Sequence, residues 1–436
     1  MAGYIIVDVK TKKTVAICAA IGVGVFVIGI LIGFFSGKGH GSNSAAISQS
    51  DQPTAAEELL AECTWSLAES SSGLRFVERY IERHSEKNIC VENSEQCMDL
   101  ALPRHYIAYH LNTADITIDG KLDEKAWDEV EWSENFVDMR SVVYPDPYYT
   151  TKFKMRWDND RLYVGAVLQE RDFWATNTKH DSNIWQENGF EMLVDVDGTM
   201  FNYKQMQINV LGTMMDQVLF KSPYDQIGNE SIREKEWHPD ARKEVYVDGT
   251  VNKPGDIDKY WSVEMALSFD NLKDHSERVQ PNPIDDEVCF VQFGRSEQHL
   301  ENVNGEYRKK KNSTTDWWAW QPCDAINLHL QDRWGLVQFK RTLADNEFKF
   351  TKWHIYKSLF DMMNGMKKYK ALHGRYVNTI EELDIPPYLL SRNCVDIPEI
   401  RIEDRNGTKG FDITVKSMFL SHKPAHIRED RYVYFK

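Results

Sequence analysis

The chain contains 436 residues, of which 67 are acidic and 52 are Lys or Arg, so its formal charge is −15 at pH 7. This length favours two or three domains. A composition of 42% hydrophobic and 27% charged residues is that of a globular protein, which excludes wholesale disorder. The acidic balance argues against a nucleic-acid partner, because such proteins display a basic surface.

The N-terminal segment predicts a membrane anchor. Residues 15–35 carry no charge and form a stretch of 21 residues, about the ~20 needed to cross a bilayer as a helix. Three lysines lie in residues 1–14 and a single lysine follows at position 38, so the tail is expected in the cytoplasm and the remainder in a lumen or outside the cell. A cleaved signal peptide is the alternative, although its apolar core is normally shorter. Gly29 and Gly33 form a GxxxG pair, which predicts a homodimer through paired anchors.

Cysteines and glycosylation motifs support the same single-pass type II topology. Six cysteines follow the anchor, an even number that permits up to three disulfides in an oxidising compartment, at Cys63, Cys90, Cys97, Cys289, Cys323 and Cys394. Cys90 with Cys97, and Cys289 with Cys323, are the short-range candidates, but the spacing does not choose among the pairings. N-glycosylation triplets begin at Asn229, Asn312 and Asn406, all beyond the anchor.

Three regions follow the anchor. Residues 36–104 combine a Gly/Ser-rich linker with a helical pattern and are expected to form a stem. Residues 105–341 hold 11 of the 13 Trp and predict an antiparallel β-sandwich or jelly roll. Its expected strands cover residues 151–157, 161–169, 189–195, 203–211, 245–251, 260–267, 287–293 and 335–340. Residues 342–436 predict an α+β extension that opens with an amphipathic helix ending at Gly374.

Four segments of the central region, in order, resemble the family 9 carbohydrate-binding modules. They are ADITIDGKLDEKAW (114–127), WDNDRLYVGAVLQE (157–170), NIWQENGFEMLVDVDG (183–198) and YKQMQINVLGT (203–213), and the region closes with W-x-P and DRWGLVQF. The resemblance covers about residues 105–341. It implies a β-sandwich that binds a sugar without chemistry, using aromatic walls with carboxylate, amide or Arg groups between them.

The resemblance and the strand pattern together select candidate binding residues. Trp185 stands in the run that matches the family's first stacking Trp, and Glu191 matches its carboxylate. Alternation along the strand also places Glu191 opposite the apolar positions 190, 192 and 194. Gln207 and Asn209 share one strand face, where the family has Arg-x-Asn, so this chain lacks a charged bidentate donor. A second wall is expected from the closing segment, with Trp320, Asn327 and His329 as candidates. The alternatives are structural: a core role for Trp185 and Trp320, an ion pair or a solvated strand position for Glu191, a turn-facing amide for Asn209 and a structural histidine for His329.

Three other functions remain open. Asp195 and Asp197 end an apolar strand and could hold a structural Ca²⁺, although a plain turn is the simpler interpretation. The same D-x-D could serve a lumenal glycosyltransferase, but that fold needs alternating helices and strands. The departure at Gln207 also permits an adhesion or scaffold module whose sugar site has decayed. We expect no catalytic residues and no other cofactor, and the leading hypothesis is a membrane-anchored, non-catalytic glycan-binding protein.

Overall fold

The computed structural model describes residues 3–9, 12–20, 25–31, 97, 100, 102–111, 116–225, 231–405 and 407–436, the first three ranges as backbone only. The chain divides into two compact units, Met1–Ser85 and Glu86–Lys436. The expected stem residues up to 96, together with Cys63, Cys90, Gly33, Asn229 and Asn406, lie outside the described residues.

The first unit contains an antiparallel sheet in the order β1-β2-β3, formed by β1 (Gly3–Val9), β2 (Lys12–Ala20) and β3 (Val25–Leu31). Strands β2 and β3 occupy most of the stretch expected as a transmembrane helix, so this element differs from the prediction. Val and Ile favour strands, and pairing between strands satisfies the backbone groups that a membrane helix would satisfy internally. No helix within the described ranges combines the length and apolar character required to cross a membrane.

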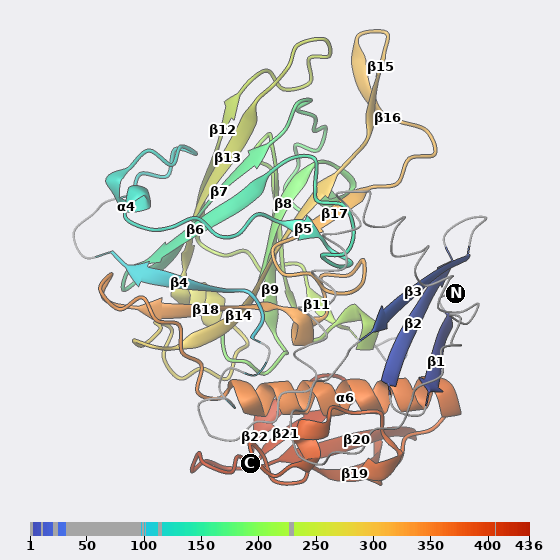
Figure 1. Ribbon diagram of the computed structural model, residues 1–436. Helices are drawn as coiled ribbons and strands as arrows, with labels where there is room; N and C mark the ends of the chain where they lie inside the picture. Colours follow the sequence, from blue (N-terminus) through green and yellow to red (C-terminus); the bar gives the residue numbers. More distant parts are fainter. Residues whose placement is uncertain are drawn as a thin grey trace, which may run out of the picture. The chain divides into compact units, whose positions relative to one another are not determined.

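The second unit is built on one sheet of 13 strands (Figure 1), with the order β11-β10-β9-β8-β14-β18-β4-β6-β7-β13-β12 and with β17 and β5 attached beside β14. Its first strands are β4 (His105–His110), β5 (Val137–Asp138), β6 (Thr151–Trp157), β7 (Arg161–Gln169), β8 (Gly189–Asp195), β9 (Tyr203–Asn209), β10 (Met214–Leu219) and β11 (Arg233–Glu234). The later strands are β12 (Ala241–Asp248), β13 (Tyr260–Ser268), β14 (Val288–Glu297), β17 (Asp316–Ala319) and β18 (Gly335–Lys340). A separate hairpin pairs β15 (Leu300–Val303) with β16 (Glu306–Lys309).

The mainly β fold is therefore confirmed, with one correction to its topology. Strand β4 pairs in parallel with both β18 and β6, whereas a wholly antiparallel sandwich was expected. The partners β4 and β18 are separated by more than 220 residues, a long-range pairing that no local pattern encodes.

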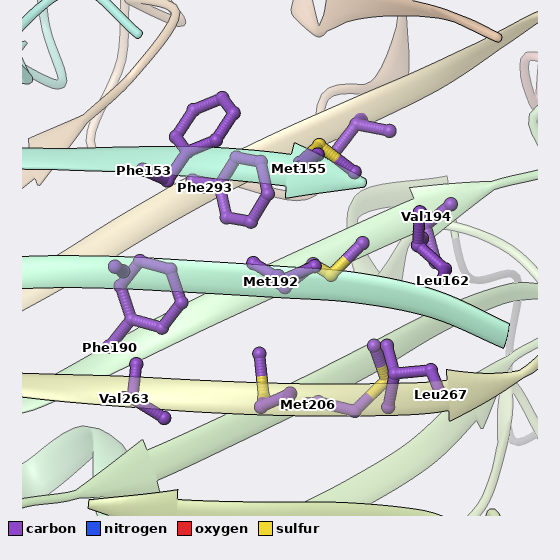
Figure 2. Close-up of a cluster of buried hydrophobic side chains, with 14 of the residues drawn as sticks. Phe153, Met155, Leu162, Phe190, Met192, Val194, Met206, Val263, Leu267 and Phe293 are labelled. Atoms are coloured by element: carbon purple, nitrogen blue, oxygen red, sulfur yellow. The ribbon is translucent and has the colours of Figure 1, made fainter. Parts of the chain in front are cut away.

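The sheet curls so that its inner face encloses an aromatic and methionine-rich core (Figure 2). Phe153 of β6 and Phe293 of β14 have ring centroids 4.0 Å apart, although β18 and β4 lie between their strands in the sheet order. Phe190 stacks on Phe293 from the neighbouring strand β8. Burial of such rings supplies the main free energy that holds a β-sandwich together.

The IDGKLDEKAW motif pins the start of this region to the sheet. The Glu264 carboxylate on β13 accepts hydrogen bonds from the backbone N–H groups of Asp119 and Gly120 and from the indole of Trp127, which lies in helix α4 (Lys125–Asp128). Gly120 has φ +86°, and a Cβ there would meet the backbone of Tyr246 at 2.4 Å. The glycine is therefore required both by its conformation and by close packing. Helix α5 (Phe269–Lys273) follows β13.

The C-terminal extension combines one long helix with a four-stranded sheet, and it packs on the outer face of the large sheet. Helix α6 (Trp353–His373) ends at Gly374, which adopts the left-handed conformation of a C-terminal cap. It is followed by a sheet of β19 (Glu399–Arg405), β20 (Thr408–Val415), β21 (Ala425–Arg428) and β22 (Val433–Phe435). The Met and aromatic side chains of α6 join one buried cluster with residues of β8, β9, β10 and β14, which makes this stripe part of the core.

The disulfide pattern differs from the expected short-range pairs. Cys97 is bonded to Cys394, across a sequence separation of 297 residues. Cys289 and Cys323 are buried free thiols, so the expected bridge between them is wrong. Cys289 faces the inner core from β14, whereas the Cys323 sulfur accepts a hydrogen bond from Gln292, so the two thiols belong to different buried environments.

Candidate functional site

A pocket of about 330 Å³ opens on the outer face of β8, β9 and β10, beyond the end that α6 covers. Strand alternation creates this face: Phe190, Met192 and Met206 point into the inner core, whereas Glu191 and Gln207 point outward. The register sets Glu191 of β8 directly opposite Gln207 of β9. We call this cavity the outer-face pocket.

The floor of the outer-face pocket is a carboxylate held by amides. Gln207 Nε2 donates to Glu191 Oε2 at 2.7 Å, and Gln205 Nε2 donates to Glu191 Oε1. Gln217 of β10 in turn donates to Gln205 Oε1. Burial raises the pKa of Glu191 to about 7, even though the two amide hydrogen bonds act to lower it. The floor therefore holds a carboxyl group whose charge changes near neutral pH.

One acceptor on this floor has no partner within the described part of the chain. Gln207 Oε1 is buried, and no protein group donates a hydrogen bond to it. A buried polar atom without a partner costs free energy unless a ligand or water satisfies it. Two neighbouring hydroxyl groups placed on the floor could each donate one hydrogen bond, the first to this oxygen and the second to the Glu191 carboxylate.

An exposed aromatic residue stands at the rim. Trp185 belongs to the short 3-10 helix Ile184–Gln186, whose Ile184 is buried and anchors the turn. The Trp185 side chain remains 47% exposed, which is unusual for a Trp in a molecule where five other Trp are fully buried. Tyr224 and Ile326 are also exposed at the pocket, at 67% and 56%. Such apolar surface around a polar floor is typical of a ligand site.

Asn327 and His329, two of the closing-segment candidates, also line the outer-face pocket. Asn327 Oδ1 accepts a hydrogen bond from the His329 backbone, which fixes the turn. His329 Nδ1 lies 2.8 Å from the Tyr203 hydroxyl. Burial lowers the pKa of His329 to about 4, so its ring is neutral at physiological pH.

Two other sequence candidates lie elsewhere. Trp320 is fully buried, contacts Phe153 and Phe293 edge-on, and donates its indole N–H to Glu134, so its assignment to the second wall is wrong. Asn209 is fully buried at the end of β9 and does not line the pocket. Its amide donates to the Asn177 carbonyl and to Glu187, and its oxygen accepts from Leu211 and Thr213. Asn209 therefore holds a turn.

Several pocket residues were missed from the sequence. Gln205 lies two residues before Gln207 on β9, and Gln217 of β10 is paired with Gln205. Strand alternation could therefore have identified both as residues of the outer face. Tyr224, Trp317 and Arg233 come from separate segments that only the fold brings together. Arg233 forms no ion pair with any described residue, and it lines the pocket in which the resemblance led us to expect an Arg on β9.

The Asp195-Val-Asp-Gly198 turn uses its carboxylates for structure. Asp195 accepts backbone hydrogen bonds from Asp197, Gly198 and Met200. Asp197 accepts from Thr199 and, across the fold, from the backbone of Glu277. A Cβ at Gly198 would meet the Tyr356 hydroxyl at 2.5 Å, so the turn packs closely under α6. The carboxylates of both Asp residues are thus engaged in hydrogen bonds that hold the turn.

Comparisons with known proteins agree with the resemblance read from the sequence. The model of the family described as "Carbohydrate family 9 binding domain-like" matches residues 118–218. This range contains Trp185, Glu191 and Gln207 but not the closing segment with Asn327 and His329. Residues 118–218 therefore form a domain like those of carbohydrate-binding family 9, and the predicted resemblance is confirmed over them.

Two solved structures are among those to which the chain is similar. A family 9 carbohydrate-binding module from Caldicellulosiruptor kristjanssonii in complex with cellotriose is 15% identical, with a TM-score of 0.35 over 57% of this chain and 99% of that chain. A family 9 module from the same organism in complex with glucose is also 15% identical, with a TM-score of 0.35 over 56% of this chain and 99% of that chain. The chain matches no curated protein.

Proposed function

We propose that this chain binds a glycan in the outer-face pocket without acting on it chemically. One observation carries the proposal: the exposed Trp185 indole stands beside a buried carboxylate and amides in a pocket of ligand size. A pyranose presents an apolar CH face and pairs of neighbouring hydroxyl groups. Trp185 supplies a surface for the CH face, and Glu191 with Gln207 supplies acceptors for two hydroxyl groups.

Arg233 compensates in this proposal for the guanidinium that the resemblance led us to expect on β9. It reaches the pocket from β11, and its five N–H donors suit sugar oxygens. A weak single site of this kind gains from display of several copies on one surface. The match of residues 118–218 to the family 9 carbohydrate-binding model supports a sugar as the ligand. The experiments below identify which sugar it is.

The test is calorimetry and a glycan array with the purified full-length chain in mild detergent. Cello-oligosaccharides are the first probes, since the Caldicellulosiruptor modules bind cellotriose and glucose. We expect Trp185→Ala to weaken binding by at least about tenfold, because a stacking aromatic at a small site dominates its affinity. Tyr144→Ala is the matched control: this aromatic is 40% exposed but lies outside the pocket, and binding should not change.

The negative outcomes separate the alternatives. Absence of binding across the array would overturn the proposal and favour the adhesion or scaffold function. Release of reducing sugar would overturn the non-catalytic part of it, and turnover of a nucleotide-sugar with Mn²⁺ would favour a glycosyltransferase. Equal losses in the Trp185 and Tyr144 variants would show that the pocket is not the binding site.

We further propose that residues 15–35 anchor the chain as a single-pass type II membrane protein. The uncharged stretch and the lysines before it support this topology. The Cys97–Cys394 disulfide and the exposed Asn312 triplet fit an oxidising compartment. In a bilayer the stretch would satisfy its backbone as a helix, and Gly29 and Gly33 would let two anchors pair.

Alkaline carbonate extraction and glycosidase digestion test this topology. An anchored lumenal chain stays in the membrane pellet and loses mass when its N-glycans are removed. A chain that appears in the supernatant without glycans would contradict the anchor. Replacement of Gly29 and Gly33 by Ile should reduce cross-linked dimer without changing extraction, if the glycines pair the anchors.

A further inference from the structure

Four side chains converge beside the outer-face pocket in an arrangement that the proposed glycan site does not use. They are His180, Asp181, Asp216 and His238, and one nitrogen or oxygen from each lies within 4.8 Å of all the others. His180 and Asp181 precede the Trp185 turn, Asp216 lies on β10, and His238 follows β11. Three separate segments of the chain therefore meet at one point.

Several distances among these groups are close to the edges of a tetrahedral metal site, and one ligand atom from each group lies within 4.8 Å of the other three. His180 Nε2 lies 3.2 Å from His238 Nδ1, 3.3 Å from Asp216 Oδ2 and 3.5 Å from Asp181 Oδ1. A tetrahedron of N and O ligands at about 2.0–2.1 Å from Zn²⁺ has edges of about 3.3 Å. His238 Nδ1 lies 3.1 Å from the other carboxylate oxygen of Asp216, Oδ1, so this one carboxylate contacts both imidazoles.

The accessibility of the four groups also suits a metal. The Asp216 carboxylate is buried, whereas the two imidazoles and Asp181 are open to solvent, so an ion can enter without unfolding. Asp181 has φ +62° and donates its backbone N–H to the Met214 carbonyl, which fixes its position beside β10. Two imidazoles favour a borderline ion over Ca²⁺ or Mg²⁺, which prefer all-oxygen sites.

We propose that His180, Asp181, Asp216 and His238 bind one Zn²⁺ ion at the edge of the outer-face pocket. The ion would join the segment that leads into Trp185 to β10 and to the segment after β11. Asp181 and Asp216 also line the pocket, so the ion would lie next to any bound ligand. A metal in this position fixes the rim and thereby the orientation of the Trp185 indole.

The test uses the full-length chain with any affinity tag removed and with metal stripped by a chelator. Titration with Zn²⁺ against a chromophoric competitor should give one equivalent bound. Co²⁺ should give the intense visible absorption of a tetrahedral site. We expect His180→Gln and His238→Gln each to weaken Zn²⁺ binding by more than about tenfold. Both side chains are half exposed, so the fold should persist, and circular dichroism checks this.

His275→Gln is the matched control, because His275 also pairs with a carboxylate, Glu234 at 3.2 Å, but stands outside the cluster. Its Zn²⁺ affinity should equal that of the wild type. A wild type that binds no Zn²⁺, or variants that bind as well as it does, would show that the four groups form only a hydrogen-bonded network. A weak, octahedral Co²⁺ spectrum would overturn the tetrahedral assignment.

A second readout rests on the proposed glycan binding. If the ion fixes the Trp185 rim, removing Zn²⁺ should weaken sugar binding in the wild type but not in Trp185→Ala. This readout fails if the glycan proposal fails, whereas the Zn²⁺ titration does not depend on any sugar. The two proposals can therefore fail separately.

Discussion

Strands β8 and β9 have an outer face that is buried at one end and open to a pocket at the other. At one end, Leu193 and Tyr203 of β8 and β9 are buried in the cluster that contains α6. At the other end, Glu191 and Gln207 of the same strands line an open pocket. Two residues along β8 and four along β9 thus separate the buried contact with α6 from the candidate ligand site on the same face, because alternate residues of a strand share a face.

The difference shows what the C-terminal extension does for the site. It covers the apolar end of the outer face, where Phe290 of β14 contacts Tyr356 and Phe360 of α6 with ring centroids 5.1 and 6.2 Å apart. The polar end is left accessible. Stability is therefore concentrated at the covered end and ligand chemistry at the open end, and mutations should separate the two properties.

The largest expected effect is on stability, at the covered end. Phe360→Ala should lower the free energy of unfolding by about 3–5 kcal/mol, because it removes a buried ring between α6 and the sheet. Chemical denaturation measures this change. Leu372→Ala on the same helix is the control, since its side chain is 72% exposed and should change stability by less than about 0.5 kcal/mol. Equal losses of stability in Phe360→Ala and Leu372→Ala would contradict the packing of α6 on the sheet.

Glu191→Gln should change how stability depends on pH at the open end. The pKa of Glu191 is raised to about 7 in the fold, so the native state binds its proton more tightly than the unfolded chain does. The wild type should therefore lose stability as pH rises from about 4.5 through about 7, by on the order of 3 kcal/mol from this group. The variant should lack this loss, which denaturation at pH 5 and pH 8 detects. If the free energy of unfolding changed with pH in the same way in the wild type and in Glu191→Gln, the raised pKa of Glu191 would be contradicted.

Sugar affinity should follow the opposite pH trend. The ionised Glu191 carboxylate accepts hydrogen bonds from sugar hydroxyl groups, and it is protonated as pH falls through about 7. Affinity should decrease by about tenfold between pH 8 and pH 6, measured by calorimetry, while the fold becomes more stable. Affinity that is flat over this range would remove Glu191 from the binding mechanism. Glu191→Gln should abolish the pH dependence.

The smallest effect is expected from Gln207→Leu. Loss of its amide removes a hydrogen bond that lowers the pKa of Glu191, so this pKa should rise above about 7. The midpoint of the pH dependence of sugar binding should move upward, with a modest loss of affinity at pH 8. An unchanged midpoint would show that Gln207 does not tune the carboxyl group.

Local pattern predicted much of this molecule. The bounds of β6, β7, β8 and β18 coincide with the predicted strands, because clear alternation and turn residues mark both ends. Gly374 likewise marked the end of α6. Alternation also identified Glu191 and Gln207 as opposite to the core, and the structure places both at the pocket.

The errors lie where long-range packing decides. Trp320 was a candidate for the second wall, yet Gly335 lets its ring enter the core: a Cβ on Gly335 would meet the Trp320 ring at 2.4 Å. Asn209 shares a strand face with Gln207, but the turn that follows β9 engages its amide. The Cys97–Cys394 bond and the parallel pairing of β4 depend on contacts between distant segments. No local pattern contains that information.

The Cys97–Cys394 bond has a mechanical consequence for a chain held from its N-terminal side. Tension applied before residue 97 enters the fold by two covalent routes, through residues 98–104 into β4 and through the sulfur bridge into the C-terminal extension. Strand β4 lies between β18 and β6, so pulling it out requires shearing two rows of hydrogen bonds. If the chain captures a glycan as proposed, the force on it would be shared between both routes, and reduction of the bridge would direct that force onto β4 alone.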